Sequence, residues 1–368
     1  MTMISMEGIA NAWTATGSTA VQRLFFDRQA EFWMGELDPL RSLTEIRARV
    51  VEVVEETEDT KTFVLQPNAA WRGHRAGQYT SVEVEVDGVR VRRCYSISSR
   101  PGEALVSITV KRVPGGRVST WLHEHTRSGE ILRLGAAAGD FVLPSATPAK
   151  LLLLSGGSGI TPVMSMLRGL RAHDAIDDVV FVHYARSRAD VIFGEELADL
   201  AAGHAGLRLV LCLDDEPSAP RGFEEVRFAG LVPDFAERST FLCGPGPLMD
   251  RAERLWASVD ASDRLQRESF APAPTLMPSA SPAKGVQVLL ARSDRAVVAK
   301  GEGSLLEQLE RAGERPAHGC RIGICHSCKC RKRSGTVHNL VTGEVSSEPD
   351  EEIQLCISVP RSDLELDL

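Results

Sequence analysis

Four cysteines near the end of the chain constrain it more than any other feature. They follow the spacing C-x4-C-x2-C and then a longer gap: Cys320, Cys325, Cys328 and Cys356. This spacing is typical of a 2Fe–2S cluster, because a tight loop wraps the cluster with three thiolates and a distant segment supplies the fourth. Gly319 and Gly323 in the same loop let backbone amides approach the inorganic sulfurs. The sequence therefore predicts a 2Fe–2S centre held by these cysteines.

Two other uses of these cysteines stay open. Zinc is bound by cysteine and histidine, and His318 and His326 lie close enough in the sequence to join a zinc site. The thiols could also be purely structural, whereas disulfides are unfavourable in the reducing compartment expected below. Cys330 is not part of the spacing, and we interpret it as a free thiol beside the loop.

Composition excludes several classes of protein. The chain has 368 residues, 43% hydrophobic and 25% charged, which fits two or three globular domains rather than a disordered or disulfide-stapled chain. Its net charge of −8 argues against nucleic-acid binding. No apolar run approaches the ~18 residues of a membrane span, and the N-terminus lacks the basic and apolar regions of a signal peptide. We expect a cytoplasmic protein with reduced cysteines.

The order of patterns along the chain predicts a multidomain α+β protein. Residues 1–45 are expected to form a helical extension, whose aromatic residues could pack on the body or dock on a partner or membrane surface. Short alternating strands over 46–147 predict an antiparallel β-barrel. Buried strands alternating with helices over 148–270 predict an α/β domain with a parallel sheet. A proline-rich linker, 271–284, then leads to a last domain over 285–368.

Two short motifs in the barrel are suited to a flavin. Arg93 can pair with a phosphate, Tyr95 can pack flat on an isoalloxazine ring, and Ser96 can hydrogen-bond near flavin N5. Gly115 and Gly116 open a helix and can present bare N–H groups to a pyrophosphate. Each motif alone is a weak signal. Their joint occurrence just before an α/β domain indicates flavin binding.

A glycine-rich turn follows the first buried strand of the α/β region. Residues 156–162 read Gly-Gly-Ser-Gly-Ile-Thr-Pro, which predicts a phosphate-binding loop between a strand and a helix. Pro162 stands where the usual dinucleotide fingerprint has a third glycine, and proline suits the first turn of a helix. Cys243 ends a later strand at the same carboxyl edge, which is where ligands bind in open α/β sheets.

Taken in order, these motifs resemble the ferredoxin–NADP⁺ reductase family, and the cysteine module resembles a plant-type ferredoxin. The order of barrel, nucleotide domain and C-terminal ferredoxin is similar to the reductase components of bacterial oxygenase and hydroxylase systems. The resemblance covers about residues 46–368. It implies an FAD-binding barrel, an NAD(P)-binding domain and a β-grasp ferredoxin domain. The segment from Phe32 to Leu40 resembles actinobacterial reductases that serve acyl-CoA and fatty-acid desaturases.

The resemblance also implies roles for individual residues. The cofactors would be held by Arg93, Tyr95, Ser96, Gly116, Val118 and Ser119 for the flavin, and by Gly157 and Thr161 for the nicotinamide nucleotide. Cys243 would face the nicotinamide ring, Glu268 would stabilise the reacting rings, and Phe270 would cover the flavin. We therefore expect Ser96, Cys243 and Glu268 to be the catalytic residues. The chain continues beyond Phe270, where plant-type members end, so its covering role stays open.

The identities of the two nucleotides depend on short segments. Similar reductases use FAD or FMN, and the glycine-opened helix at 115–121 favours FAD, which has a second phosphate. Arg186 and Arg188 follow the second parallel strand, where a 2′-phosphate would fall, and they favour NADPH with NADH as the alternative.

These expectations combine into a reductase that passes electrons from NAD(P)H through FAD and a 2Fe–2S cluster to a protein partner. We expect that partner to be a diiron fatty-acyl desaturase or hydroxylase. The alternatives are a Rieske oxygenase, a cytochrome P450 or a hybrid-cluster protein as acceptor, and, more remotely, a redox-sensing module without turnover. No nucleic-acid partner and no transmembrane segment are expected, although the protein could touch a membrane-bound partner. The cations between 315 and 333 predict a basic rim for an acidic partner, unless the acids at 350–352 balance it.

Overall fold

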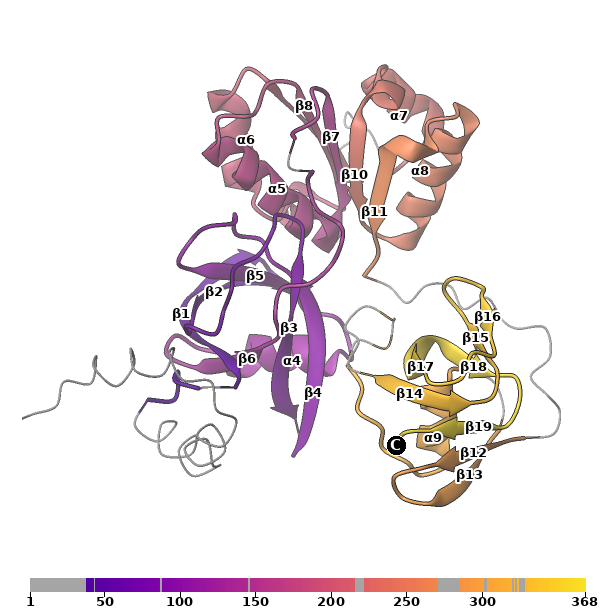
Figure 1. Cartoon of the computed structure of the whole chain (residues 1–368). Helices are drawn as coiled ribbons and strands as arrows, with labels where there is room; N and C mark the ends of the chain where they lie inside the picture. Colours follow the sequence, from indigo (N-terminus) through magenta and orange to yellow (C-terminus); the bar gives the residue numbers. More distant parts are fainter. Residues whose placement is uncertain are drawn as a thin grey trace, which may run out of the picture.

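The computed structural model contains three domains, which confirms the predicted fold class (Figure 1). The residues it describes are 38–42, 44–86, 88–144, 146–215, 222–270, 285–300, 303–319, 321, 323 and 328–368. The expected N-terminal helix and the proline-rich linker lie outside these residues. Among the described residues, no helix is both long and apolar enough to cross a membrane.

The flavin domain is a six-stranded antiparallel sheet. Its strands, in spatial order, are β4 (Val89–Ser96), β3 (Tyr79–Val86), β6 (Ile131–Leu134), β1 (Ile46–Thr57), β2 (Thr60–Pro67) and β5 (Val106–Lys111). A bridge between Ile97 and Ile108 brings the end of β4 to β5, so the two edges of the sheet meet as a barrel requires. Helix α4 (Arg117–His125) adds Val118 and Leu122 to the barrel core.

The NAD domain is a five-stranded parallel sheet with helices on both faces. Its spatial order is β11 (Leu265–Glu268), β10 (Ser239–Cys243), β7 (Leu151–Gly156), β8 (Val179–Ala185) and β9 (Leu207–Leu213). Helices α5 (Ile160–Ala172) and α6 (Gly194–Gly203) cover one face, and α7 (Glu225–Leu231) and α8 (Gly246–Ser258) cover the other. The chain order reverses between β7 and β10, and such a switch point is where ligands bind in this architecture.

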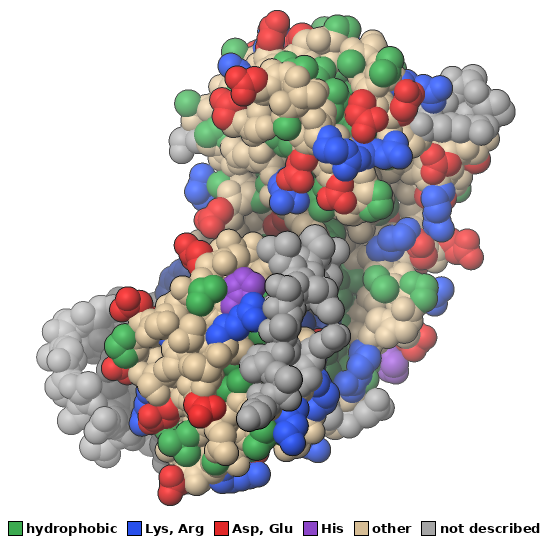
Figure 2. Space-filling view, turned by 90° about the vertical axis from the view of Figure 1, so that its right-hand side faces the viewer, with side chains coloured by type: hydrophobic (Ala, Val, Ile, Leu, Met, Phe, Trp, Pro, Cys, Tyr) green, Lys and Arg blue, Asp and Glu red, His purple; other side chains and the backbone are tan. Residues whose placement is uncertain are grey.

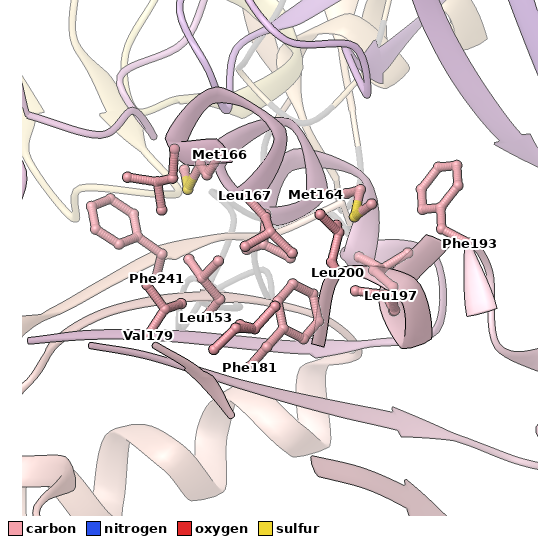
Figure 3. Close-up of a cluster of buried hydrophobic side chains, with 14 of the residues drawn as sticks. Leu153, Met164, Met166, Leu167, Val179, Phe181, Phe193, Leu197, Leu200 and Phe241 are labelled. Atoms are coloured by element: carbon pink, nitrogen blue, oxygen red, sulfur yellow. The ribbon is translucent and has the colours of Figure 1, made fainter. Parts of the chain in front are cut away.

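The run of leucines in β7 explains why this sheet is buried on both sides. Leu151 and Leu153 belong to the core beneath α5 and α6, whereas Leu152 and Leu154 face the α7 and α8 side. All four are fully buried, as a central parallel strand requires. Figure 3 shows Leu153 packed with Phe181 and Leu167 between the sheet and its helices. Each such side chain contributes about 1.5–3 kcal/mol when it is fully buried.

The ferredoxin domain combines a mixed sheet, a small second sheet and one helix. The larger sheet has the order β13 (Arg295–Ala299), β12 (Val286–Leu290), β19 (Leu364–Leu366), β14 (Lys329–Ser334) and β17 (Glu351–Gln354). The smaller sheet has the order β16 (Val345–Ser346), β15 (Val337–Asn339) and β18 (Ser358–Pro360). Only β12 and β19 pair in parallel among the described strands of this domain. Helix α9 (Leu305–Arg311) begins at a capping box formed by Ser304 and Glu307.

Candidate functional site

Three residues expected to be catalytic lie where the flavin and NAD domains meet. Ser96 ends β4, and Glu268 ends β11 directly opposite Cys243 at the end of β10. Burial raises the pKa of Glu268 to about 8, and the nearby Ser96 hydroxyl opposes that shift. Burial also raises the pKa of the Cys243 thiol, and Glu268 adds to this effect. At neutral pH both side chains are therefore uncharged.

Two polar atoms at this junction are buried without a well-formed hydrogen bond to a described residue. They are Ser96 Oγ and Glu268 Oε2. Buried polar atoms cost free energy unless they are paired, so a ligand with hydrogen-bonding groups at this junction would offset that cost. An isoalloxazine ring carries such groups along its edge. The residues present therefore fit a flavin.

A cavity of about 580 Å³ opens beside Glu268, and all three domains contribute to it. It is lined by Tyr79, Ala138, Gly139, Asp140 and Phe141 of the flavin domain, by Gln266, Arg267, Glu268 and Ser269 of the NAD domain, and by Gly323. Gly139 packs against the Tyr79 ring, because an added Cβ would lie 2.9 Å from it. The sequence reasoning missed Tyr79 and Gln266, which carry no motif of their own.

The other flavin residues occupy different positions in the fold. Arg93 and Tyr95 lie on β4, where Tyr95 packs against the barrel core and burial raises the pKa of its phenol. Arg93 lies close enough to Tyr95 for its charge to oppose that pKa shift, and its Nη1 donates to the Arg92 carbonyl at 2.8 Å and to the Gly319 carbonyl at 2.9 Å. Phe270 follows β11 and is 41% exposed, so its covering role stays a prediction.

The expected pyrophosphate site lies at the start of α4. Gly116 is the N-cap of that helix, and the N–H groups of a first helical turn have no acceptor within the helix. Val118 is buried in the barrel core. The Ser119 hydroxyl accepts from the Val113 N–H at 3.2 Å and so closes the preceding turn. The side chains of Val118 and Ser119 thus shape the turn, and its backbone N–H groups remain for a phosphate.

The nucleotide turn is held tightly against β10. An added Cβ on Gly159 would lie 2.1 Å from the Cys243 carbonyl oxygen, so only glycine permits this approach. Gly157 has a φ of +53°, and an added Cβ there would meet open space. Thr161 is buried and donates to the Ser158 carbonyl at 3.0 Å. The turn is thus rigid on its inner side and open on the side where a nucleotide would lie.

A second cavity of about 670 Å³ lies over this turn. Its lining includes Lys111, Gly156, Gly157, Tyr184, Arg186, Asp190, Asp214, Phe223, Pro245, Leu248 and Arg251. Arg186 pairs with Asp190 and lies 3.6 Å from Asp59, and the Ser187 hydroxyl donates to Asp190 at 2.7 Å. Arg188 is exposed and lies outside the lining. Lys111 and Arg251 are cations that the sequence reasoning missed.

Helix α5 of the NAD domain also forms hydrogen bonds with Ser98 and Ser99, which follow β4 in the flavin domain. Ser165 donates to the Ser99 carbonyl at 2.6 Å, and Arg168 Nη1 donates to the Ser98 carbonyl at 2.6 Å. The remaining Arg168 nitrogens form a bidentate pair with Glu196 on α6. The nucleotide helix and the segment that follows Ser96 are therefore joined by charge-assisted hydrogen bonds.

Two of the four predicted cluster ligands are described, and they lie together. Cys328 Sγ and Cys356 Sγ are 3.2 Å apart and buried. This separation is too long for a disulfide, whose S–S bond is about 2.05 Å, and it suits two thiolates that converge on one metal ion. The donor set fits an iron–sulfur centre. Cys320 and Cys325 lie outside the described residues.

The described parts of the cluster loop are anchored within the ferredoxin domain. Gln354 donates to the Gly323 carbonyl at 2.6 Å, and Arg321 forms a bidentate pair with Glu310 of α9. Gly323 has a φ of +82°, and an added Cβ would lie 2.9 Å from Ile357. Cys330 lies on β14 with its side chain in the core, and burial raises its pKa to about 11.

Four cations of the expected basic rim pair with acids, which favours the alternative that acids balance it. The pairs that neutralise it are Arg321 with Glu310, Lys329 with Glu352, Lys332 with Glu351 and Arg333 with Asp367. Lys332 is also fully buried. The alternation of residues along β14 turns it inward. Figure 2 shows both signs of charge interspersed over the face it presents.

Comparisons with known proteins give the same three parts in the same order. Family models match as an oxidoreductase FAD-binding domain over residues 47–143, an oxidoreductase NAD-binding domain over 153–254, and a 2Fe–2S iron–sulfur cluster binding domain over 288–361. These matches cover the barrel, the parallel sheet and the ferredoxin fold described above.

Individual relatives match along most of the chain. An "NADPH oxidoreductase" of Mycobacterium tuberculosis is 41% identical over 336 residues, which is 90% of this chain and 86% of that protein. A "glycine betaine monooxygenase reductase subunit" of Pseudomonas aeruginosa is 36% identical over 87% of this chain and 94% of that protein. The solved structure of phthalate dioxygenase reductase superposes with a TM-score of 0.60 at 24% identity, covering 88% of this chain and 98% of that one.

Proposed function

This chain belongs to the family of FAD- and NAD-binding oxidoreductases that carry a 2Fe–2S domain, and from that premise we propose that it supplies electrons to an oxygenase component. It is an NAD(P)H-dependent enzyme with FAD and a 2Fe–2S cluster. The observation that carries the proposal is the junction beside Glu268, where the flavin, NAD and ferredoxin domains line one cavity.

Bound FAD supplies the conversion of a two-electron hydride donor into single electrons, and the bound cluster supplies their one-electron exit. We assign the chain's own contribution to three side chains. The neutral Cys243 thiol and the protonated Glu268 present no charge to the nicotinamide. Ser96 Oγ and Glu268 Oε2 offer hydrogen-bonding groups with which a bound ring would pair. Their burial keeps water from the reacting positions.

NADPH is the proposed donor. Arg186 lines the nucleotide cavity and already holds an anionic partner, Asp190. A 2′-phosphate is a stronger and more highly charged acceptor than a carboxylate for such a guanidinium. The relative at 41% identity is described as an NADPH oxidoreductase, which supports this choice. Arg188 is not needed for it.

The acceptor that we propose is an oxygenase, which the sequence analysis gives as the alternative, rather than the diiron desaturase or hydroxylase that it puts first. The aromatic segment that suggested a desaturase lies outside the described residues. The relatives named above include a monooxygenase reductase, and none of them is described as serving a desaturase. We therefore place oxygenase components first, and a Rieske oxygenase first among those.

The test uses the purified holoprotein. Stopped-flow mixing with NADPH and with NADH should bleach the flavin absorbance faster with NADPH at equal concentration. Steady-state turnover should then be measured with a Rieske oxygenase component, a cytochrome P450 and a diiron desaturase as acceptors. Turnover with the oxygenase supports the proposal. Turnover with the desaturase alone would show that the protein is a desaturase reductase, as the sequence first suggested. If no acceptor is reduced, cytochrome c included, the protein is a sensing module.

A further inference from the structure

Arg93 links two domains that are far apart in the sequence. Its guanidinium extends from β4 of the flavin domain, and Nη1 donates to the carbonyl of Gly319 at 2.9 Å, across 226 residues of chain. Gly319 is buried and immediately precedes Cys320, the first predicted cluster ligand. Figure 1 shows β4 on the side of the flavin domain that faces the ferredoxin domain.

We propose that Arg93 is an interdomain positioning residue, which docks the cluster loop on the flavin domain. The proposal rests on the proposed electron path, because that path requires the cluster to lie close to the flavin. Arg93 is expected from the sequence to hold a flavin phosphate, and the bond to Gly319 is a different task. Its effect on electron transfer would be indirect, through the position of the loop.

Two other bonds of the described part of the loop stay within the ferredoxin domain. Gln354 holds Gly323, and Glu310 holds Arg321, and all four residues belong to the ferredoxin domain. These bonds fix the loop to its own domain and leave the domain free to move as a body. The bond from Arg93 comes from outside, so it opposes that movement.

The lining of the cavity beside Glu268 supports the same arrangement. Gly323, four residues beyond Gly319, lines the cavity that Tyr79 and Glu268 also line. The described part of the loop therefore borders the cavity at the junction of the domains, as well as accepting the bond from Arg93. The bond from Arg93 is the direct polar contact between this part of the loop and the flavin domain.

The geometry also leaves Arg93 able to contact the flavin. Both of its bonds to described residues use Nη1. A guanidinium has five N–H donors in a planar fork, and those on Nε and Nη2 donate to none of the described residues. One side chain can thus bind an anionic group and the Gly319 carbonyl together. Reciprocity of binding then makes flavin occupancy favour docking and docking favour flavin binding.

The test compares R93Q, R93K and R92Q. Arg92 is the matched control, because it is adjacent and its guanidinium pairs with Glu83 within the flavin domain at 2.8 Å. Turnover with ferricyanide, which can take electrons from the flavin, and with cytochrome c, which takes them through the cluster, is measured per bound flavin. Hydrogen–deuterium exchange across residues 303–319 is measured in the holoprotein and after flavin removal.

The expected result is a ratio of cytochrome c to ferricyanide turnover that falls about tenfold in R93Q, the size expected for one charge-assisted hydrogen bond. R93K, which keeps a cationic donor, should lose less, and R92Q should keep the wild-type ratio. Exchange across 303–319 should rise in R93Q, and in wild-type protein it should rise on flavin removal.

Two outcomes would overturn the proposal. In the first, R93Q and R92Q show equal ratios and equal exchange, so the bond docks nothing. In the second, R93Q loses flavin and both activities in proportion while exchange stays at the wild-type level, so Arg93 is a flavin ligand only. If R93Q does not fold, R93K carries the comparison. Failure of the proposed acceptor would leave the exchange result intact, so the two proposals are tested separately.

Discussion

Replacing Arg168 with methionine should loosen the joint between the nucleotide helix and the flavin strand. Arg168 lies on α5, donates to the Ser98 carbonyl at 2.6 Å, forms a bidentate pair with Glu196, and stacks 4.6 Å from the centre of the Phe193 ring. Its side chain is 20% exposed. Methionine keeps much of the apolar stem and removes every one of these polar contacts.

The size of the effect can be estimated from its parts. A hydrogen bond from a charged donor contributes about 1.5–3 kcal/mol. A cation over an aromatic ring adds about 0.5–1 kcal/mol. The pair with Glu196 is partly solvated and contributes little beyond its hydrogen bonds. Because such contributions do not add fully, we expect a loss of about 2–4 kcal/mol, which corresponds to a fall of roughly 5–10 °C in the unfolding midpoint.

Hydride transfer should slow as well. The N-terminus of α5 carries the glycine turn, so a shift of this helix moves the nucleotide relative to the flavin. A misplacement of about 1 Å can cost about 100-fold in rate, and we expect flavin reduction by NADPH to slow by about 10–100-fold. The assay is stopped-flow bleaching of flavin absorbance at saturating NADPH, together with thermal unfolding.

R171M is the matched control. Arg171 is one turn along the same helix and is exposed. R171M should keep wild-type stability to within about 0.5 kcal/mol, as surface substitutions do. Equal reduction rates in R168M and R171M, with an unfolding midpoint that differs by less than 2 °C (about 1 kcal/mol), would refute the reasoning.

Three further predictions follow from the other domains. C356S should remove the broad visible absorbance of the cluster and the bound iron while the flavin bands persist, because Cys356 and Cys328 lie 3.2 Å apart as expected for two ligands of one cluster. A visible spectrum and an iron analysis of the purified variant check this prediction. K332M should lower the free energy of unfolding of the ferredoxin domain by about 3 kcal/mol, because the buried Lys332 ammonium donates to the Glu348 carbonyl at 2.6 Å and pairs with Glu351; urea curves followed by loss of the cluster absorbance check it. In flavin-free protein, the pKa of Glu268 is raised from 4.5 to about 8, so its folded state binds the proton more tightly. The wild type should lose stability relative to E268Q as the pH rises from about 5 to 8, and parallel melting curves would contradict this.

The sequence was informative where a pattern has one physical meaning. The leucine run 151–154, bounded by a glycine turn, is typical of a strand buried on both faces, and the turn itself predicted the start of a helix. The cysteine spacing likewise predicted a cluster loop, and Cys328 and Cys356 do converge. Short edge strands were harder to predict. β6 and β11 have four residues each, and neither segment alternates for long enough to indicate a strand.

Charged residues were the least predictable part of the site. Counting cations along 315–333 suggested a basic rim, yet several of them pair with acids from other strands. Arg186 was assigned to a phosphate from its position after β8, and in the structure it also binds Asp190. A charge count along a sequence takes no account of which opposite charge the fold brings close.

Three hydrogen bonds between domains share a property that explains why no motif predicts them. The acceptors of Arg93, Ser165 and Arg168 are all backbone carbonyls. Every residue has such a carbonyl, so the acceptor leaves no trace in the sequence, and only the donor can be recognised. The donors converge on the cluster loop and on the two residues after Ile97, which continues from β4. Because β4 also carries the predicted flavin residues, one strand sets the position of the nucleotide helix on one side and of the cluster loop on the other. Such contacts should tolerate changes at the acceptor residues and be sensitive to changes at the donors.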